Sequence, residues 1–308
     1  MRSSHLHLAL IVPLALLCAC QLAPAERVQR ARDALYDKDP KKALAEFRLA
    51  LDGLEQKSTP EARVLKAVAL KGVADTYFLE LHDVRQAVTA YKEVIAQCPE
   101  SKETLDARIT LAGILADDYH DLRAAITELT AALARNPPQS AELHYDVAKL
   151  YFQLGDFRQC ELETAQLVKT FETSAFVDDA LFLEAQAVAM QEGRRRDAEA
   201  LFEKLPLRFP ESELSPHAYF ELGKLYAEED RDSEAIDAWV KALAHHPDPA
   251  LVQAAISRVR RRITKNNVEV GVKAAFAKPK PVAKPAHKLT SVEAAGGTAE
   301  EAKHDFGD

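Results

Sequence analysis

The sequence predicts an all-α protein in which helical hairpins repeat along the chain and stack into a solenoid. Leu and Ala dominate the 308 residues, and only ten are Gly, a composition typical of helices. A small residue, a bulky residue and a proline also recur at a nearly constant interval, most completely between Pro216 and Pro247. Because one hairpin cannot bury its own apolar face, this recurrence predicts that neighbouring hairpins cover one another.

The chain begins with a segment typical of a bacterial export signal. Arg2 precedes an uncharged apolar run, Leu6–Ala19. This run is shorter than the roughly 20 residues that a helix needs to cross a bilayer, so we interpret it as part of a signal peptide. The sequence Leu17-Cys18-Ala19-Cys20 resembles a lipobox. That resemblance implies a signal peptide over 1–19, acylation of Cys20 and a lipid-anchored tether over 20–27.

The residues after Cys20 leave one alternative open. Gln21 stands where the lipoproteins retained in the inner membrane carry Asp, so the same resemblance points to the periplasmic face of the outer membrane. The segment Ala23-Pro24-Ala25 is, however, an A-x-A cleavage site, and cleavage there would release a soluble periplasmic protein.

Residues 28–247 carry six copies of the hairpin pattern. The small residue expected to begin each second helix recurs at intervals of 44, 38, 35, 38 and 37 residues, at Ala43, Ala87, Ala125, Cys160, Ala198 and Ala235. Four residues later a bulky side chain follows in five copies, and a proline ends four of them. The pattern resembles the 34-residue tetratricopeptide repeat, which implies a superhelical solenoid of about six hairpins.

The C-terminal part of the sequence is basic. Residues 248–266 are expected to form a capping helix with Leu251, Ala255, Val259 and Ile263 on its apolar side. Residues 267–308 are rich in Lys, Pro and Ala, a composition that predicts disorder. We define the basic arm by six residues, Arg258, Arg261, Arg262, Lys278, Lys280 and Lys284. It is expected either to contact anionic material such as peptidoglycan or to be a solvated cap and linker.

Charge and motifs argue against several function classes. Between Gln21 and Ala254 there are 28 Lys and Arg against 42 Asp and Glu, a net charge of −14 that disfavours binding of nucleic acid. No nucleophile elbow, zinc-protease motif or phosphate loop occurs, so we expect neither catalysis nor a cofactor. We also expect no metal at His245-His246, because adjacent histidines point to different sides of a helix end.

The tetratricopeptide resemblance implies a partner-binding groove. In this family, positions two, five, nine and twelve of the first helices line the groove. Transferred to repeats four to six, they predict a mainly apolar groove with two lysines, which would bind an amphipathic helix or extended peptide. The residues that we expect to line it are Tyr145, Lys149, Phe152, Leu183, Met190, Phe220 and Lys224.

The whole predicted fold resembles tetratricopeptide-repeat outer-membrane lipoproteins of Gram-negative bacteria. Residues 90–101 and 207–212 look like the repeat ends of BamD-type assembly lipoproteins and Tol–Pal-associated proteins, and six repeats behind a lipobox also match type IV pilus pilotins. This resemblance implies a non-enzymatic scaffold that docks proteins of an envelope or motility machine. Two alternatives remain open: an assembly factor for outer-membrane β-barrels or secretins, and a soluble periplasmic regulator of cell-wall enzymes.

Overall fold

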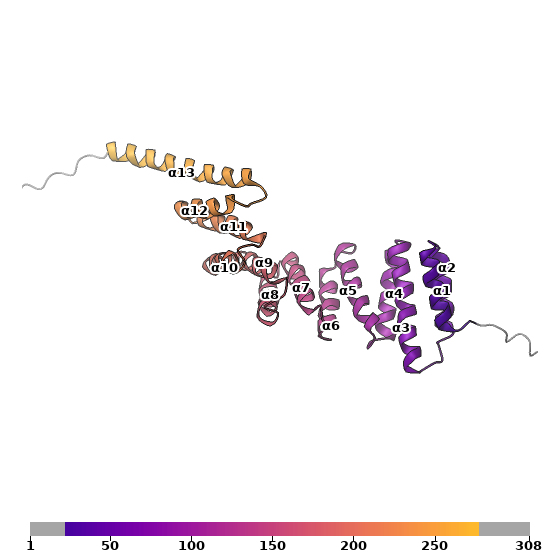
Figure 1. Ribbon diagram of the computed structural model, residues 1–308. Coiled ribbons are helices and arrows are strands. Elements are labelled where there is room, and N and C mark those ends of the chain that lie inside the picture. The colour runs from indigo at the N-terminus through magenta and orange to yellow at the C-terminus, as the bar shows by residue number, and fades with distance from the viewer. Residues whose placement is uncertain (1–21, 277–308) are drawn as a thin grey trace, which may run out of the picture. The chain divides into compact units, whose positions relative to one another are not determined.

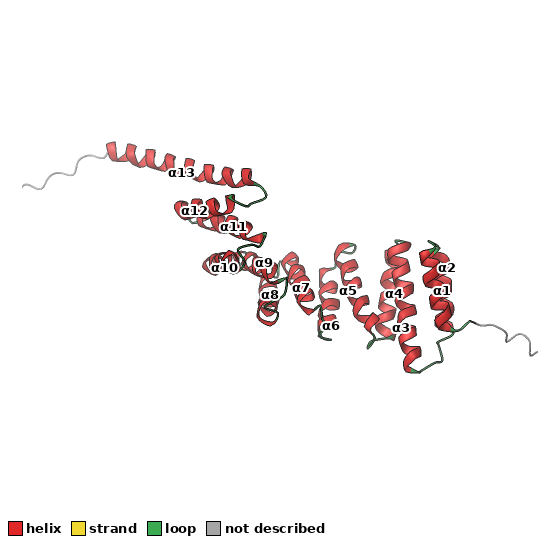
Figure 2. Cartoon of the chain, viewed as in Figure 1, coloured by secondary structure: helices red, strands yellow, loops and turns green. Residues whose placement is uncertain are grey.

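The computed structural model describes residues 22–276, with side chains to residue 268, and this part of the chain is helical apart from short loops (Figure 2). The predicted signal peptide, Cys20, Lys278, Lys280 and Lys284 lie outside the described residues. Six helical hairpins follow one another along the chain (Figure 1). They belong to the first of two compact units, which ends at Arg260.

Each hairpin consists of a first and a second helix. The first helices are α1 (Pro24–Tyr36), α3 (Pro60–Asp75), α5 (Lys102–Asp117), α7 (Ser140–Leu154), α9 (Val177–Ala189) and α11 (Leu214–Glu228). The second helices are α2 (Pro40–Asp52), α4 (Val84–Gln97), α6 (Leu122–Leu133), α8 (Phe157–Thr170), α10 (Arg195–Arg208) and α12 (Asp232–Leu243). A π-helical turn, η2 (Thr76–Glu80), follows α3, and α13 (Pro249–Phe276) follows the last hairpin.

The two helices of each hairpin pack on each other, and each second helix packs on the next first helix. First helices also contact the first helix of the next hairpin, in the pairs α1–α3, α3–α5, α7–α9 and α9–α11. We call these six first helices the first-helix layer. This stacking of sequential hairpins confirms the predicted fold class.

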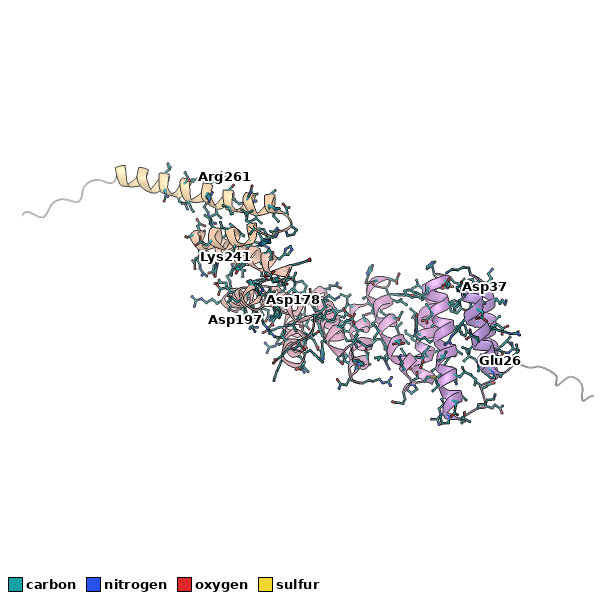
Figure 3. All side chains as sticks on the ribbon, viewed as in Figure 1. Glu26, Asp37, Asp178, Asp197, Lys241 and Arg261 are labelled. Carbon is teal, nitrogen blue, oxygen red and sulfur yellow. The ribbon has the colours of Figure 1, made fainter. Side chains whose placement is uncertain are left out.

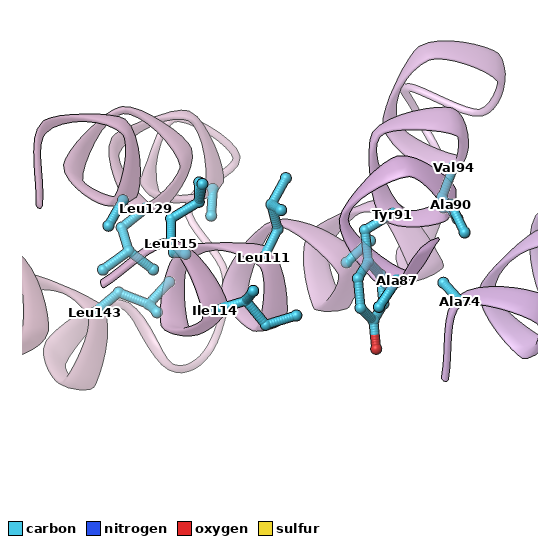
Figure 4. Close-up of a cluster of buried hydrophobic side chains, with 14 of the residues drawn as sticks. Ala74, Ala87, Ala90, Tyr91, Val94, Leu111, Ile114, Leu115, Leu129 and Leu143 are labelled. Atoms are coloured by element: carbon cyan, nitrogen blue, oxygen red, sulfur yellow. The ribbon is translucent and has the colours of Figure 1, made fainter. Parts of the chain in front are cut away.

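The small residues that set the predicted repeat lie in the core. All six of them, Ala43, Ala87, Ala125, Cys160, Ala198 and Ala235, have no exposed surface. Ala87 and Ala125, in the second and third hairpins, belong to a continuous apolar cluster around Tyr91, Leu111 and Leu143 (Figure 4). Small side chains at these positions let the helices approach closely enough for the large ones to interdigitate.

The turn inside each hairpin follows a common pattern. Two residues stand immediately before each second helix. The first of them has a positive φ, and the second directly precedes the helix. In the first four hairpins this second residue is an aspartate whose side chain accepts a hydrogen bond from the third residue of the helix, as Asp121 does from the backbone N–H of Ala124 at 3.0 Å. Such caps satisfy backbone donors that a helix start leaves open.

In the last two hairpins an arginine replaces the capping aspartate. Arg194 bonds to Glu161 of α8 at 2.5 Å, and Arg231 bonds to Glu199 of α10 at 2.7 Å. Glu161 and Glu199 each directly follow the small residue of the preceding repeat. In these two hairpins, an ion pair between neighbouring hairpins therefore takes the place of a helix cap within one hairpin.

Both ends of the repeat array differ from the predicted boundaries. α1 begins at Pro24 rather than near residue 28, because proline suits the first position of a helix, where the N–H has no partner. Helix α1 therefore includes residues 24–27, which the sequence assigned to the predicted tether. At the other end, α13 extends to Phe276, ten residues beyond the predicted 248–266.

The first part of α13 buries a different face from the predicted one. Val252, Ile256 and Val259 are buried, whereas Leu251 is 47% exposed. The spacing of three and four between the buried residues follows the helical period better than the predicted steps of four.

The two cysteines within the described residues, Cys98 and Cys160, are both free and buried. Burial raises the pKa of the Cys160 thiol to about 12 and also raises that of Cys98. At neutral pH both are therefore thiols rather than reactive thiolates. In this part of the chain, no helix combines the length and the apolar character needed to cross a membrane.

Candidate functional site

The first-helix layer is the candidate binding surface, and in the fourth hairpin Tyr145 and Lys149 lie together on α7. The Tyr145 ring is half-buried against Phe176, with centroids 5.8 Å apart, and the Lys149 ammonium lies 4.9 Å from the Tyr145 centroid. Lys149 also pairs with Asp146 at 2.8 Å. Burial, followed by the charge of Asp179, raises the pKa of Tyr145 to about 12, so its hydroxyl is a neutral hydrogen-bonding group.

Phe152 and Phe220 are partly buried by side chains of their own hairpins. The Phe152 ring meets Phe157, at the start of α8, edge-on with centroids 5.3 Å apart. Phe220 lies 6.4 Å from Trp239 and 5.2 Å from His246. Each ring is held in place by these contacts and keeps part of its surface open.

The two lysines expected to attract an acidic partner already have carboxylates beside them. Lys149 pairs with Asp146, and Lys224 pairs with Glu221 at 2.6 Å. Both pairs join residues three apart on one exposed helix face, where an ion pair is worth less than about 1 kcal/mol. Their positive charge is thus partly cancelled locally.

In the fifth hairpin, the residues that face the first-helix layer stand one position earlier in the chain than the residues predicted from the sequence. Leu183 is only 8% exposed and packs in a cluster with Ala148, Cys160 and Ala187, so it lies between hairpins rather than on an open face. Ala180, Ala185 and Ala187 of α9 are fully buried as well, and five residues separate α9 from α10. Met190 follows the end of α9 and is 61% exposed.

The shifted frame is supported by contacts between neighbouring first helices. Phe182 meets His217 of α11 with ring centroids 6.4 Å apart, and Tyr145 is electrostatically coupled to Asp179 of α9. The fifth hairpin therefore presents Asp179 and Phe182 to the layer. The sequence signal for this one-residue shift was the longer turn around Gly193. The prediction counted a fixed number of residues back from Ala198 and made no allowance for that turn.

The first three hairpins contain two neighbouring hollows that sequence reasoning missed. One, of about 640 Å³, lies between α1 and α3, with apolar walls from Ala25, Val28, Pro60, Val64, Leu65 and Val68. Its polar lining comes from Gln29, Arg32 and Glu61. The other, of about 290 Å³, reaches α5 and shares Arg32 and Val68 with the first. The hint was present in Val64 and Val68, which are four residues apart and therefore lie on one face of a helix.

A further hollow of about 620 Å³ lies where α10 and α12 end and α11 begins. His217 and His245 contribute to its lining, and His217 also meets the buried His246 edge-on with centroids 4.7 Å apart. Among the described residues, no three His, Cys, Asp or Glu side chains come together in a way that could hold a metal ion.

The basic arm is described only in part. Arg258 is exposed in the first compact unit and Arg261 is exposed in the second, while Arg262 is half-buried. Figure 3 labels Arg261 on α13.

The repeats match a known family model. The model, described as a tetratricopeptide repeat, matches residues 110–158 and 183–251, which include α6, α7 and α10 to α12. These two stretches are tetratricopeptide repeats, and the stacked hairpins around them have the solenoid arrangement of such repeats. Its repeats are packing units, and the model names no ligand.

Solved structures show the same fold at low sequence identity. The C-terminal part of a tetratricopeptide-repeat protein from Cytophaga hutchinsonii is 14% identical, with a TM-score of 0.58, covering 76% of this chain and 88% of that one. The structure of Naa15/Naa10 bound to HypK-THB gives a TM-score of 0.53 at 15% identity, covering 82% of this chain and 36% of that chain.

One neighbour relates to the pilotin resemblance. PilW, a type IV pilus biogenesis factor, is 15% identical with a TM-score of 0.46, covering 76% of this chain and 98% of that chain, too weak a likeness to argue function. No curated protein matches the sequence.

Proposed function

We propose that this tetratricopeptide-repeat protein is a non-enzymatic scaffold that docks segments of partner proteins on its first-helix layer. The observation that supports this most directly is that hollows open between the first helices, over exposed apolar side chains such as Val64. Tetratricopeptide repeats build extended surfaces for partner segments, and an exposed apolar surface between helices is suited to an amphipathic partner.

Photo-crosslinking in cells tests the docking surface. A crosslinking amino acid at Val64, Phe152 or Phe220 probes the first-helix layer, and one at Leu162 or Val240, which are exposed on second helices, serves as the control. We expect one partner from the first-helix positions and a weaker or absent product from the controls. Equal capture of the same partner from both sets would contradict the proposal.

We further propose that the mature chain begins with an acylated Cys20. The start of α1 at Pro24 supports this over cleavage after Ala25. Cleavage there would remove Ala23, whose N–H bonds to Glu26 at 3.2 Å, and Pro24, which packs against Gly53. Mass spectrometry of the mature N-terminus decides the matter, since an unmodified chain starting at Glu26 would exclude the anchor.

The anchor would place the scaffold at the periplasmic face of the outer membrane, where we propose that it serves an envelope or motility machine. Only residues 21–23 would separate Cys20 from α1, a reach of at most roughly 14 Å. The first hairpin would therefore lie close to the bilayer surface. Membrane fractionation of cells expressing the chain and its Cys20→Ser variant tests this, and an unchanged distribution of the variant would refute the anchor's role.

The basic arm supports a secondary proposal, contact with anionic peptidoglycan. Exposed Arg258 and Arg261 are available for such a contact. Co-sedimentation with purified peptidoglycan should then weaken steeply as salt rises from 50 to about 300 mM, because salt screens exposed charges. Salt-independent sedimentation would exclude binding by charge.

A further inference from the structure

We propose that the hollow between α1 and α3 binds a partner segment in which apolar side chains are followed by a carboxylate, and that Arg32 receives this carboxylate. The inference rests on the proposed docking function and specifies its partner. It places the main contact on the first two hairpins, away from the residues predicted from the sequence.

The walls of the hollow determine the apolar part of the partner. α1 contributes Ala25 and Val28, and α3 contributes Val64 and Val68. Val28 forms part of the buried core, whereas Val64 is 60% exposed and stands at the rim. An apolar side chain inserted here would cover exposed Val64 without moving the core, and the volume of 640 Å³ lies in the range of binding sites for small ligands.

Arg32 supplies the positive charge that would contact a bound partner. This exposed residue lines both neighbouring hollows, and no hydrogen bond or ion pair of its guanidinium is found within the described side chains. Of the other basic residues nearby, Arg27 pairs with Glu46 at 3.0 Å and Lys71 pairs with Asp75 at 2.8 Å. Lys102 lines only the second hollow, beside Glu103 and Asp106. A carboxylate is the group that a free guanidinium binds best, because two parallel hydrogen bonds can form.

The positions of the charges also orient the partner. Glu61 lies in the first turn of α3, about two turns before Val68, and Val68 borders the same pair of hollows as Arg32. Within the hollow between α1 and α3, Glu61 is the acidic lining residue and Arg32 the basic one, whereas the neighbouring hollow is lined by both signs of charge. A carboxylate in the hollow between α1 and α3 would therefore be repelled by Glu61 and attracted by Arg32.

The test begins with a displayed library of random 12-residue peptides selected on the full chain. We expect the enriched peptides to share two or more apolar residues followed by Asp or Glu. The dissociation constant of the most enriched peptide, labelled with a fluorophore, is then measured by anisotropy. Val64→Asp should weaken binding at least tenfold, and Arg32→Glu about tenfold.

Two matched variants serve as controls. Val240→Asp introduces the same charge at a valine of α12 that is 52% exposed, and Arg30→Glu reverses an exposed charge on α1 outside the hollow's lining. Both should leave the affinity unchanged. Thermal melts of all four variants identify any that fail to fold, in which case Val64→Thr replaces Val64→Asp.

Three outcomes would overturn the inference. If peptides bind but respond to Phe220→Ala and not to Val64→Asp, the scaffold function stands and this location is wrong. If no peptide binds, the docking function fails together with it. If palmitate binds and Val64→Asp abolishes that binding while peptide affinity is unchanged, the hollow is a lipid site instead.

Discussion

Gly223 offers a direct test of how closely the hairpin helices must approach. A Cβ at this position would lie 2.5 Å from Trp239 Cδ1, and the ring is only 3% exposed. Its Nε1 also donates a hydrogen bond to the carbonyl oxygen of Phe220 at 3.0 Å, so the ring cannot shift without weakening that bond. Gly223→Ala should therefore force the two helices apart.

The expected change in the free energy of unfolding for Gly223→Ala is the sum of opposing effects. Overpacking costs about 1–3 kcal/mol, and a weakened hydrogen bond adds up to about 1 kcal/mol. Ala gains about 0.5–1 kcal/mol over Gly inside a helix. The net loss lies between about 0 and 3.5 kcal/mol, and its midpoint of about 2 kcal/mol corresponds to a fall in Tm of roughly 4–8 °C for a chain of this size.

Gly113→Ala is the matched control. Gly113 also lies inside a first helix, but a Cβ there would meet nothing within 4 Å. This change should raise the free energy of unfolding by about 0.5–1 kcal/mol.

Circular dichroism gives the melting temperature, and fluorescence reports on the last hairpin alone, because Trp239 is the single tryptophan of the sequence. Combining Gly223→Ala with Trp239→Leu should recover much of the Gly223→Ala loss, since the smaller side chain relieves the clash. If Gly223→Ala is as stable as the unchanged chain and leaves the fluorescence spectrum unaltered, the close-approach argument is refuted.

Three further predictions concern charge and capping. Burial raises the pKa of Glu184 to about 6 from 4.5, so its charged form costs the folded state about 1–2 kcal/mol at pH 7, and this cost disappears as the pH falls toward 4.5. Glu184→Gln should thus raise Tm at pH 7 but not at pH 4.5 in calorimetry, and an equal effect at both would contradict the assignment. Burial and His246 lower the pKa of His217, so below about pH 6.5 the unfolded chain takes up a proton that the folded chain resists, and stability falls. His217→Gln should flatten this decline in urea titrations between pH 7 and 5, whereas an unchanged slope would exclude His217 as its source. Asp121→Ala should cost about 1 kcal/mol in urea unfolding by removing a helix cap, while Asp118→Ala, outside the cap, should cost little; equal losses would show that the cap contributes nothing.

The sequence predicted the hairpins well because the same physical constraint acts in every repeat. A residue facing the partner helix across a short distance must be small, and all six predicted positions are fully buried. The boundaries of the hairpins were predicted less well, because proline at Pro24 fits inside the first turn of a helix as well as before it.

The candidate surface could be predicted only in part. Tyr145, Lys149 and Phe220 belong to first helices, where their role in a groove stays a prediction, whereas Leu183 of α9 is buried between hairpins. The hollow at Arg32 depends on how α1 and α3 approach each other, and no local sequence pattern encodes that distance. The proposed groove residues remain a prediction until a partner is bound.

The nearest-neighbour packing of the helices has a consequence for folding. The helix contacts that define the array join elements at most two helices apart in chain order, so contact order is low and folding can begin in one hairpin and spread to its neighbours. Each hairpin gains a neighbour as soon as the next one emerges during synthesis or export, and no distant segment is needed to complete it. Amide hydrogen exchange should accordingly be slowest in the middle hairpins and faster toward α1 and α12, because an end hairpin is stabilised from one side only.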